Sequence, residues 1–411
     1  NSILTKKNSS ELDFQESVAK RKRFNFVLVR FLLTYVKLFR SSKFSFFQGS
    51  KLKNSSSKLF GFYSTENQKK TIDSLNNSEI HSISLVKHIE ADAYMGLNFL
   101  KSFFLIPLLW IIFYLIHLKR TSFKETVRLF SVTGEKIILA ALYYLEYKTF
   151  LSNYKVTSVL IANDHSPETR SLIWAAKSQR RRVICNYIQH GTVSNAFPEL
   201  RIFDNAFLDG EYSKDTYSEI SDFDTKCYLV GAIRLPHIEV TNNILNSNIV
   251  NIALNDTIDV LGFKELVVKI KNVFTVGTQF QVRFHRQQSE ERLLIKECIS
   301  NGILISNKSQ QLSDFLSTSN FLVTVSSGIV IDALKLGVMP LIYLSEDNID
   351  YFEYLNHGVG IDLNKFKLDQ IDFVSTLEKL RENAKYYDAL IGCNTNVRTD
   401  NINLVNSVLA N

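Results

Sequence analysis

A histidine and a glycine stand side by side where a short apolar run ends in this sequence. The run 182–188 predicts a buried β-strand, and Gln189-His190-Gly191-Thr192 follows it directly. An imidazole there can accept a proton from a hydroxyl or hold a phosphate oxygen, and a glycine lets a ligand approach the backbone closely. We therefore predict His190 as a catalytic base, with Gln189, Gly191 and Thr192 lining the substrate site. The alternative is a histidine that only fixes its loop by hydrogen bonds.

Two carboxylates offer alternative bases one strand earlier in the chain. Asp164 follows the predicted strand 156–162, and Pro167 then opens a helix that carries Glu168 in its first turn. A carboxylate that ends a parallel strand lies where open α/β sheets bind their ligands. Asp164 and Glu168 are therefore further candidate catalytic residues, although Asp164 could equally serve as the N-cap of the helix.

A serine-rich turn joins the predicted strand 321–325 to the predicted helix 329–336. Unpaired backbone N–H groups, the positive end of the helix dipole and two hydroxyls meet at this turn, which suits it to an anion such as a phosphate. The simpler alternative is that Ser326 only caps the helix. The predicted phosphate-binding residues are Ser326, Ser327, Gly328 and, one turn into the helix, Asp332.

A second histidine, His285, ends the predicted strand 281–284 and is flanked by Arg283 and Arg286. Cations at the end of a strand can stabilise a departing phosphate. We predict that these three residues bind the same anion as the serine-rich turn. A structural histidine with a solvated arginine beside it is the alternative.

Strands and helices alternate regularly after about residue 150, a rhythm that is typical of βαβ units and a parallel sheet. A complete series of such units runs from residue 249 to residue 344, after an asparagine-rich linker that contains Pro236. We predict an α/β fold with two doubly wound, Rossmann-like domains that face a cleft. The expected boundaries are 1–235 for the first domain, 236–385 for the second domain and 386–411 for a tail that returns to the first domain.

Taken together, these motifs resemble those of a group of bacterial glycosyltransferases with the two-domain GT-B fold. The group comprises CDP-glycerol glycerophosphotransferases, capsular polysialyltransferases and Kdo transferases, and the resemblance covers residues 155–360. In this chain an arginine follows His285, where the group usually has proline. Three short motifs carry the resemblance: Gln189-His190-Gly191-Thr192, Arg283-Phe284-His285, and Thr324-Val325-Ser326-Ser327 with Asp332.

The resemblance implies a metal-independent glycosyltransferase of bacterial surface polysaccharide synthesis. Such an enzyme moves a sugar from a nucleotide-activated donor, CMP- or CDP-linked, to a glycan or a lipid-linked glycan. In that group the first-domain histidine or a nearby carboxylate is the proposed base, which assigns the role to His190 or Asp164. The second-domain histidine and serine pair hold the donor phosphate. The neighbours of the first histidine, which are Gln189, Gly191 and Thr192, then bind the acceptor.

Several cofactor and metal chemistries lack their sequence signatures. No G-x-G-x-x-G, Walker loop, H-E-x-x-H or G-x-S-x-G motif occurs, and no two of the four cysteines have the spacing of a zinc or redox motif. We therefore expect no bound cofactor and no catalytic metal, with the nucleotide sugar as a co-substrate. Two other functions stay open. One is a non-hydrolysing UDP-sugar 2-epimerase, which needs no acceptor, and the other is a non-catalytic glycan- or membrane-binding module.

The positive charge of the chain is concentrated at its beginning. Residues 1–60 contain 13 basic and three acidic residues, whereas the whole chain carries a formal charge of +7. The run 26–39 is mostly apolar with spaced cations, which favours a helix on an anionic lipid surface, and a solvated basic face is the alternative. No motif that reads DNA or RNA accompanies it, so we expect no nucleic-acid partner. We expect a cytoplasmic protein that is peripheral on the inner face of the cell membrane.

An apolar segment without charged residues covers positions 102–118 and is followed by Lys119 and Arg120. Its 17 residues are at the short end for a membrane-spanning helix, and Pro107 and His117 weaken that role. The alternatives are a helix of the soluble core or one packed under it, a helix that lies in the plane of a membrane surface, and a true span.

Overall fold

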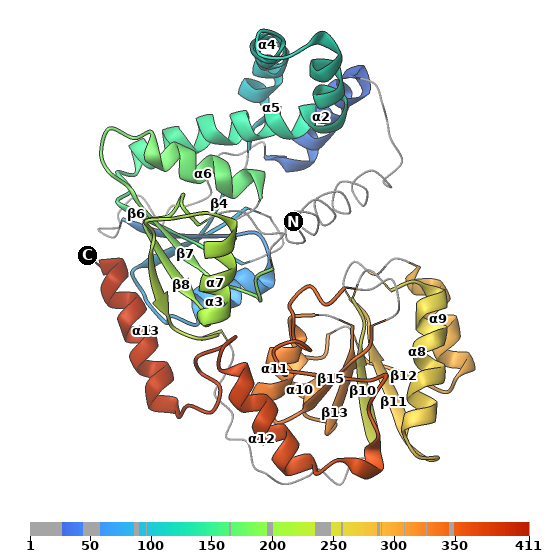
Figure 1. Ribbon diagram of the computed structural model, residues 1–411. Helices are drawn as coiled ribbons and strands as arrows, with labels where there is room; N and C mark the ends of the chain where they lie inside the picture. Colours follow the sequence, from blue (N-terminus) through green and yellow to red (C-terminus); the bar gives the residue numbers. More distant parts are fainter. Residues whose placement is uncertain are drawn as a thin grey trace.

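The computed structural model contains two large parallel β-sheets with their helices and a further group of three helices beside the first sheet (Figure 1). We call this group the helical cap; it consists of α2 (Val27–Ser41), α4 (Phe99–Leu118) and α5 (Phe123–Asn153). The predicted linker around Pro236 lies outside the described residues. The residues that the structure describes are 27–43, 58–85, 90–95, 97–163, 166–194, 200–234, 248–255, 258–285, 288, 290–307, 309–325, 327–344 and 349–410.

The first domain is built on a seven-stranded parallel sheet with the order β4-β3-β2-β6-β7-β8-β9. Three of these strands precede residue 150 and lie outside the regular alternation that the sequence predicts from about that residue. They are short, and the long helices α4 and α5 separate them from β6 in the sequence. The strands are β2 (Leu59–Tyr63), β3 (Ile80–Ser84), β4 (Ala93–Tyr94), β6 (Ser158–Ile161), β7 (Ile184–Ile188), β8 (Asn205–Leu208) and β9 (Lys226–Leu229).

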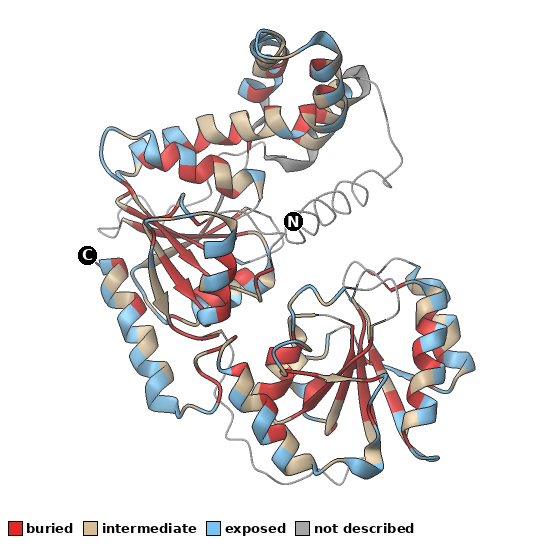
Figure 2. Ribbon diagram, viewed as in Figure 1, coloured by how far each residue is buried: buried red, intermediate tan, exposed pale blue. Residues whose placement is uncertain are grey.

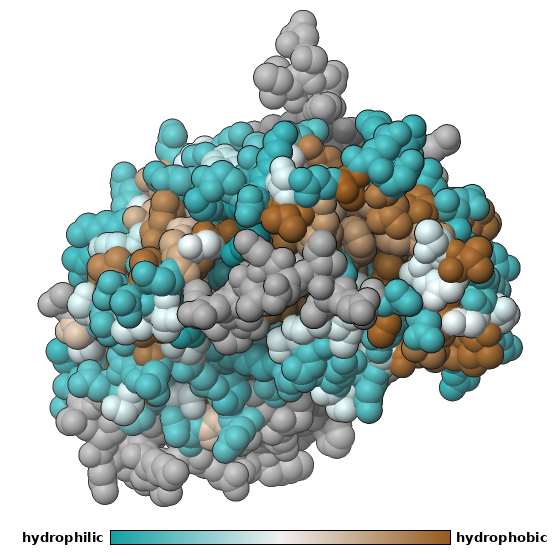
Figure 3. All heavy atoms as spheres, turned by 90° about the horizontal axis from the view of Figure 1, so that it is seen from below, coloured by the Kyte–Doolittle hydropathy of each residue, from teal (hydrophilic) through white to brown (hydrophobic). Residues whose placement is uncertain are grey.

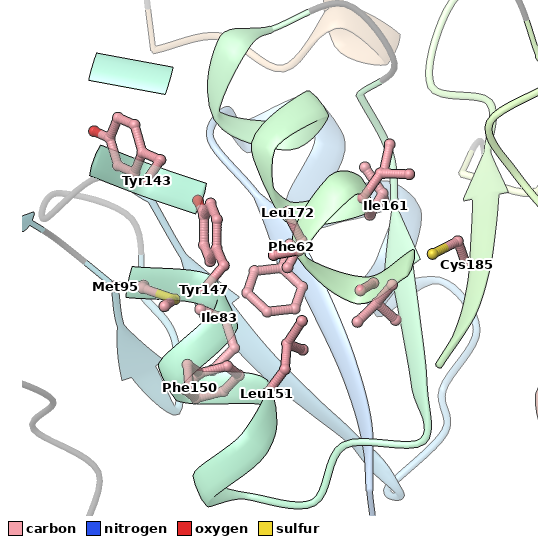
Figure 4. Close-up of a cluster of buried hydrophobic side chains, with 14 of the residues drawn as sticks. Phe62, Ile83, Met95, Tyr143, Tyr147, Phe150, Leu151, Ile161, Leu172 and Cys185 are labelled. Carbon is pink, nitrogen blue, oxygen red and sulfur yellow. The ribbon is translucent and has the colours of Figure 1, made fainter. Parts of the chain in front are cut away.

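Strand β2 shows how the core of this domain is made. All of its residues are buried, as expected for a parallel sheet that is covered on both faces. The ring of Phe62 lies 6.1 Å, between centroids, from the rings of both Tyr147 and Phe150 of α5. Figure 4 shows these side chains together with Leu172 of the next helix and Ile161 of β6. The long helix α5 and the sheet therefore share one core.

The second domain has a six-stranded parallel sheet with the order β12-β11-β10-β13-β14-β15. In both sheets the strand order reverses beside the first long strand, between β2 and β6 and between β10 and β13, and doubly wound sheets bind ligands at such points. Figure 2 shows that buried residues concentrate along the strands of both sheets. The strands are β10 (Ile249–Ala253), β11 (Gln279–Arg283), β12 (Leu304–Ile305), β13 (Phe321–Thr324), β14 (Met339–Ile342) and β15 (Ile361–Asp362).

Helices connect the strands and cover both sheets. Ser166 caps the helix that follows β6, because its hydroxyl accepts a hydrogen bond from the Thr169 N–H at 3.2 Å, so the alternative in which Asp164 is the N-cap is wrong. The helices of the first domain are α3 (Glu66–Asp73), α6 (Pro167–Lys177) and α7 (Glu211–Ile220). Those of the second domain are α8 (Val260–Val273), α9 (Glu291–Ser300), α10 (Leu312–Leu316), α11 (Ile329–Lys335) and α12 (Phe373–Ala384).

The C-terminal segment crosses from the second domain back to the first. After α12, the Ala389 N–H donates to the Asp209 carbonyl of the first domain at 2.8 Å. The last helix, α13 (Thr395–Ala410), lies beside the first sheet (Figure 1), where Val405 and Leu409 share a buried cluster with Tyr63 of β2. The chain therefore ties its two domains together after the second sheet is complete.

The helical cap is held together by a buried carboxylate and by a close helix contact. Glu135 of α5, whose side chain is 1% exposed, accepts from Arg30 of α2 at 3.0 Å and from Lys37 at 3.2 Å. Two of the spaced cations in the run 26–39, Arg30 and Lys37, therefore pair within the protein, and the lipid-surface role of this run stays a prediction. A Cβ atom at Gly134 would overlap the ring of Trp110, so glycine is what lets α4 and α5 approach each other.

Strands β1 (Ser42–Lys43) and β5 (Leu97–Asn98) form a separate parallel pair.

Helix α4 contains the apolar segment 102–118. Within the described residues it is the one helix long and apolar enough to cross a membrane, and 17% of its most apolar window is buried. A helix inside the soluble core would be buried over most of its surface, whereas α4 contributes one side to the core of the first domain, through Ile106 and Trp110. The structure leaves a helix packed under the core, the in-plane helix and the span as the alternatives.

Candidate functional site

The loop that follows β7, residues 189–192, is the histidine loop, and the amide of Gln189 fixes it. This buried side chain donates to the Gly191 carbonyl at 2.9 Å and accepts from the Asp209 N–H at 2.8 Å. Its amide therefore joins the ends of β7 and β8. His190 and Gly191 are partly exposed, and a Cβ atom at Gly191 would meet no atom within 4 Å. Gln189 thus holds the loop, while His190 and Gly191 border open space that a substrate can enter.

Thr192 brings the histidine loop into contact with the second domain. Its hydroxyl oxygen accepts from the hydroxyl of Tyr354 at 3.2 Å. A Cβ atom at Gly328 would lie 3.4 Å from the same oxygen, so the serine turn (residues 326–328, of which 327 and 328 are described) touches the histidine loop. The loop follows β7 of the first sheet and the turn follows β13 of the second. The structure therefore brings these two predicted motifs together at facing edges of the two sheets.

The serine turn leads directly into α11. Gly328 is the N-cap of this helix, and no side chain among the described residues caps it. Ser327 is partly exposed, and its carbonyl accepts from the Val330 N–H at 3.2 Å, whereas Ser326 lies outside the described residues. Because Gly328 has no side chain with which to satisfy the first N–H groups of the helix, a bound anion can do so.

Asp332 lies in the first turn of α11, next to the serine turn. Its Oδ1 atom is buried and has no hydrogen-bond partner within the described part of the chain. Burial raises the pKa of this carboxyl, and the positive charges of Arg234 and Lys335 oppose the rise. Asp332 therefore keeps its proton to a higher pH than an exposed aspartate does, and as the acid it can donate a hydrogen bond to a ligand.

Two ion pairs lie where the domains meet, and we call Asp209, Arg234, Lys335 and Asp388 the junction. Arg234 donates to Asp209 at 2.8 Å, and Lys335 of α11 lies 2.6 Å from Asp388 of the crossing segment. Lys335 also donates to the Ala232 carbonyl of the first domain at 3.1 Å. Burial raises the pKa of Asp209 to about 6, although the charge of Arg234 opposes the rise. Sequence reasoning missed these residues, because nothing in their spacing distinguishes them from charged residues of the surface.

The cluster around His285 lies at the same sheet edge as the serine turn, with β10 between their strands. Arg283 is engaged within its own domain: it donates to the Gln310 carbonyl at 2.9 Å, and its guanidinium lies 5.7 Å from the centre of the Phe315 ring. His285 is exposed, and Arg286 lies outside the described residues. Of this cluster, His285 is therefore the described residue that is placed to meet a ligand.

Of the two candidate carboxylates, the structure describes Glu168. It lies in the first turn of α6 and is partly exposed, whereas Asp164 lies outside the described residues. Helix α6 follows β6, which pairs with β7 in parallel register. Glu168 and His190 thus follow neighbouring strands and belong to the same edge of the first sheet.

A charged surface cavity of about 910 Å³ lies away from these loops. It is at the amino ends of β7, β8 and β9, and Arg182, Asp204, Asp222 and Asp224 are among its lining residues. Arg182 and Asp204 pair with each other at 3.3 Å. Across the described residues, no group of three or more histidine, cysteine, aspartate or glutamate side chains could hold a metal ion.

Comparison with known proteins gives matches in structure and none in sequence. No protein-family model matches the chain, and no curated protein sequence matches it. A solved UDP-N-acetylglucosamine 2-epimerase is 13% identical, with 86% of this chain and 95% of that chain covered and a TM-score of 0.53. The Methanocaldococcus jannaschii UDP-GlcNAc 2-epimerase in complex with UDP-GlcNAc and UDP is 15% identical, with coverages of 86% and 99% and a TM-score of 0.51. The Neisseria meningitidis UDP-GlcNAc 2-epimerase bound to UDP-GlcNAc is 15% identical, with coverages of 86% and 100% and a TM-score of 0.50.

At these identities the likeness concerns the fold. It extends over nearly the whole of each solved structure, so both domains match and not one domain alone. The matches do not single out the CDP-glycerol, polysialyl or Kdo transferase group. The predicted fold class is confirmed, and the chain has the two-domain, Rossmann-like GT-B fold.

Proposed function

We propose that this chain binds a nucleotide-activated sugar between the histidine loop and the serine turn and converts it there. The observation that carries the proposal is the contact of the two loops through Thr192, Gly328 and Tyr354. Doubly wound domains bind nucleotides at the carboxyl ends of their strands, and here two such ends from two domains meet. Two of the structural neighbours hold UDP-GlcNAc, which supports a UDP-linked sugar over the CMP- or CDP-linked sugar expected from the sequence.

The start of α11 suits the phosphates of the nucleotide. Its first N–H groups follow Gly328, and the positive end of the helix dipole adds to their attraction for an anion. Ser327 precedes Gly328 in the chain and is partly exposed, and His285 follows β11 at the same edge of the sheet. These groups can stabilise the negative charge that grows on a phosphate when its bond to the sugar is broken.

His190 and Asp332 are the groups that we assign to proton transfer. His190 belongs to the first domain, and as the neutral imidazole it can accept a proton. Asp332 belongs to the second domain, burial raises the pKa of its carboxyl, and in the acid form this group can donate a proton. A proton acceptor from one domain and a proton donor from the other suit a reaction in which one proton is removed from the sugar and another is delivered to it.

Of the reactions that fit this site, the comparisons favour epimerisation of the sugar. The three solved structures described above are all UDP-GlcNAc 2-epimerases, and this reaction requires no acceptor. Glycosyl transfer to a glycan is the second candidate, and the specific observation in its favour is the resemblance of the three sequence motifs to those of surface-polysaccharide transferases.

The deciding experiment is incubation of the purified protein with UDP-GlcNAc alone, followed by proton NMR of the sugar. Epimerisation predicts a second UDP-sugar that differs at C2 and appears without an acceptor. Release of UDP that requires an added glycan would instead support transfer. Neither product, combined with no thermal shift on adding UDP, CDP or CMP, would refute the proposal and leave the non-catalytic module.

The assignment of His190 is tested by His190→Ala, with His117→Ala on α4 as a matched control far from both loops along the chain. We expect a loss of about 10²- to 10⁴-fold in kcat for the first variant and an unchanged rate for the second. The melting temperature of His190→Ala should stay close to that of the wild type, because the side chain is partly exposed. A variant that retains the full rate would exclude His190 as the base.

A further inference from the structure

One face of α4 packs against the rest of the helical cap. Ser102, Ile106 and Trp110, which are spaced four residues apart, are buried. The Trp110 ring lies 5.2 Å from Phe130 of α5 and 5.7 Å from Phe31 of α2, between ring centroids. This spacing is that of one stripe along a helix, so α2 and α5 together cover one side of α4.

The other sides of α4 are apolar and exposed. Figure 2 shows exposed and intermediate residues over most of this helix. Leu100 is 68% exposed and Phe104 is 73% exposed. The neighbouring helix α2 likewise exposes Leu32 and Val36. The central part of the same surface, which we call the apolar face, contains Leu108, Ile111, Ile112 and Leu115.

The exposed surface of α4 is more apolar than the surface at the opposite end of the molecule. Figure 3 views the protein from below, whereas α4 is at the top of Figure 1, and in that view hydrophilic residues cover much of the surface with hydrophobic residues in separate patches. A helix that is apolar on every side is stable in water only where other protein covers it. Because α2 and α5 cover one side alone, the rest of α4 requires an apolar partner.

The charges around α4 indicate what that partner is. No aspartate or glutamate occurs between residues 99 and 118, and the exposed cations Lys119 and Arg120 follow directly at the end of the helix. An apolar helix bordered by cations complements a lipid surface with anionic headgroups, into which the apolar side chains insert while the cations stay among the phosphates.

The packing of the cap determines the orientation of α4. Glu135 of α5 lies against α2, where it pairs with Arg30 and Lys37, and Lys136 beside it is exposed. A spanning α4 would draw these neighbouring charges into the hydrocarbon layer, which is strongly unfavourable. A helix that lies parallel to the surface buries its apolar face and leaves the charged pairs between α2 and α5 on the aqueous side.

We propose that α4 is a membrane-docking helix whose apolar face inserts in the plane of an anionic bilayer, with Lys119 and Arg120 contacting the headgroups. The proposal goes beyond the proposed function and does not depend on it. It can be tested without any nucleotide sugar, so its failure would leave the proposed function unaffected.

The first test is co-sedimentation of the full chain with vesicles of phosphatidylcholine and phosphatidylglycerol. The variant Leu108→Asp/Ile111→Asp places two charges on the apolar face, and Leu261→Asp/Val268→Asp places the same two charges on exposed apolar positions of α8 in the second domain. We expect the partition coefficient to fall by about tenfold or more for the first variant and to stay unchanged for the second. Replacing phosphatidylglycerol by phosphatidylcholine should also weaken binding.

Several outcomes would overturn the proposal. Equal vesicle binding by Leu108→Asp/Ile111→Asp and Leu261→Asp/Val268→Asp would show that the apolar face does not contact the membrane. A wild-type dimer in solution that Leu108→Asp/Ile111→Asp converts to a monomer, with no vesicle binding, would show that a second copy covers the face. Equal binding to neutral and anionic vesicles would contradict the role of the cations.

The in-plane orientation has a test of its own. The variants Leu100→Cys and Lys119→Cys place thiols at the two ends of α4. For protein added outside sealed vesicles, a thiol reagent that cannot cross lipid should label both positions, as detected by peptide mass spectrometry. Labelling at one end alone would show that the helix spans the bilayer.

Discussion

The helical cap exposes apolar side chains, whereas the junction between the two domains buries charged ones. Phe104 of the cap is 73% exposed, and Asp388 of the junction is 0% exposed. Soluble proteins usually bury apolar side chains and expose charged ones, and both regions do the opposite. In both regions the exception lies at a contact surface. At the junction the contact is between two domains, and in the cap we propose that it is with lipid.

The two regions differ in what a substitution should cost. A buried ion pair gives little net stability over apolar residues of the same shape, but removing one partner leaves a charge uncompensated. An exposed apolar side chain contributes little to folding, because it stays in water in both states. The junction should therefore be sensitive in folding experiments, and the apolar face should be sensitive in binding experiments.

The largest expected effect on stability is that of Asp388→Asn. The variant leaves the ammonium of Lys335, which is 11% exposed, without its carboxylate, and we expect a loss of about 3–5 kcal/mol in the free energy of unfolding. The second substitution Lys335→Met should recover much of this loss, because it removes the unpaired charge. Urea denaturation measures both.

The matched control for this prediction is Asp362→Asn, which breaks a pair with Lys365, whose side chain is 85% exposed. Exposed pairs contribute about 0–1 kcal/mol, so this variant should unfold almost as the wild type does. An equal effect of the two aspartate substitutions would contradict the distinction between the junction and the surface.

The second prediction compares the loss of stability on replacing two isoleucines of α4. Ile106 is 0% exposed and Ile111 is 58% exposed, so the same substitution on the same helix separates the packed side from the apolar face. Ile106→Ala should cost about 2–5 kcal/mol, and Ile111→Ala should stay within about 0.5 kcal/mol. Thermal denaturation without lipid measures both. A large loss for Ile111→Ala would mean that protein covers this face in solution.

Sequence patterns sufficed for the second domain because each of its units is local. Its strands alternate with helices at close spacing, and the strand ends that carry His285 and Ser327 follow from that alternation. The first domain was harder, since β2, β3 and β4 are separated from β6 by the long helices of the cap. A short strand far from its partner in sequence has no periodic context by which to recognise it.

The candidate site was predictable as two separate motifs and not as one arrangement. Both Thr192 and Gly328 were identified from strand ends, but the role of Tyr354 in contacting Thr192 depends on how the domains meet. The same holds for Arg234 and Lys335, which raise no signal in sequence because their partners are distant along the chain. Contacts between domains are set by tertiary packing, which local patterns do not encode.

The pH dependence of stability provides a finer test of the junction. The pKa of Asp209 is raised from 3.8 to about 6, so between these values the folded chain holds a proton that the unfolded chain has released. Raising the pH through this window should therefore destabilise the fold, and Asp209→Asn should remove this contribution. We compare the free energy of unfolding of the wild type and of Asp209→Asn as a function of pH. The difference between the two should change by on the order of 2–3 kcal/mol from pH 4 to pH 6 and stay constant above that range. Parallel curves would show that Asp209 is not the titrating group.

The smallest expected loss of stability comes from a comparison of two glycines that follow neighbouring strands of the first sheet. A Cβ atom at Gly210 would lie 2.6 Å from the Tyr386 carbonyl oxygen, whereas at Gly191 it would meet nothing within 4 Å. Gly210→Ala should cost about 1–3 kcal/mol, because the backbones of the two domains would have to separate. Gly191→Ala should leave stability unchanged and weaken nucleotide-sugar binding, since the added methyl group occupies space reserved for the ligand. Thermal denaturation with and without UDP-GlcNAc distinguishes the two results, and a stabilisation by the ligand that is undiminished in Gly191→Ala would place the sugar elsewhere than at the histidine loop.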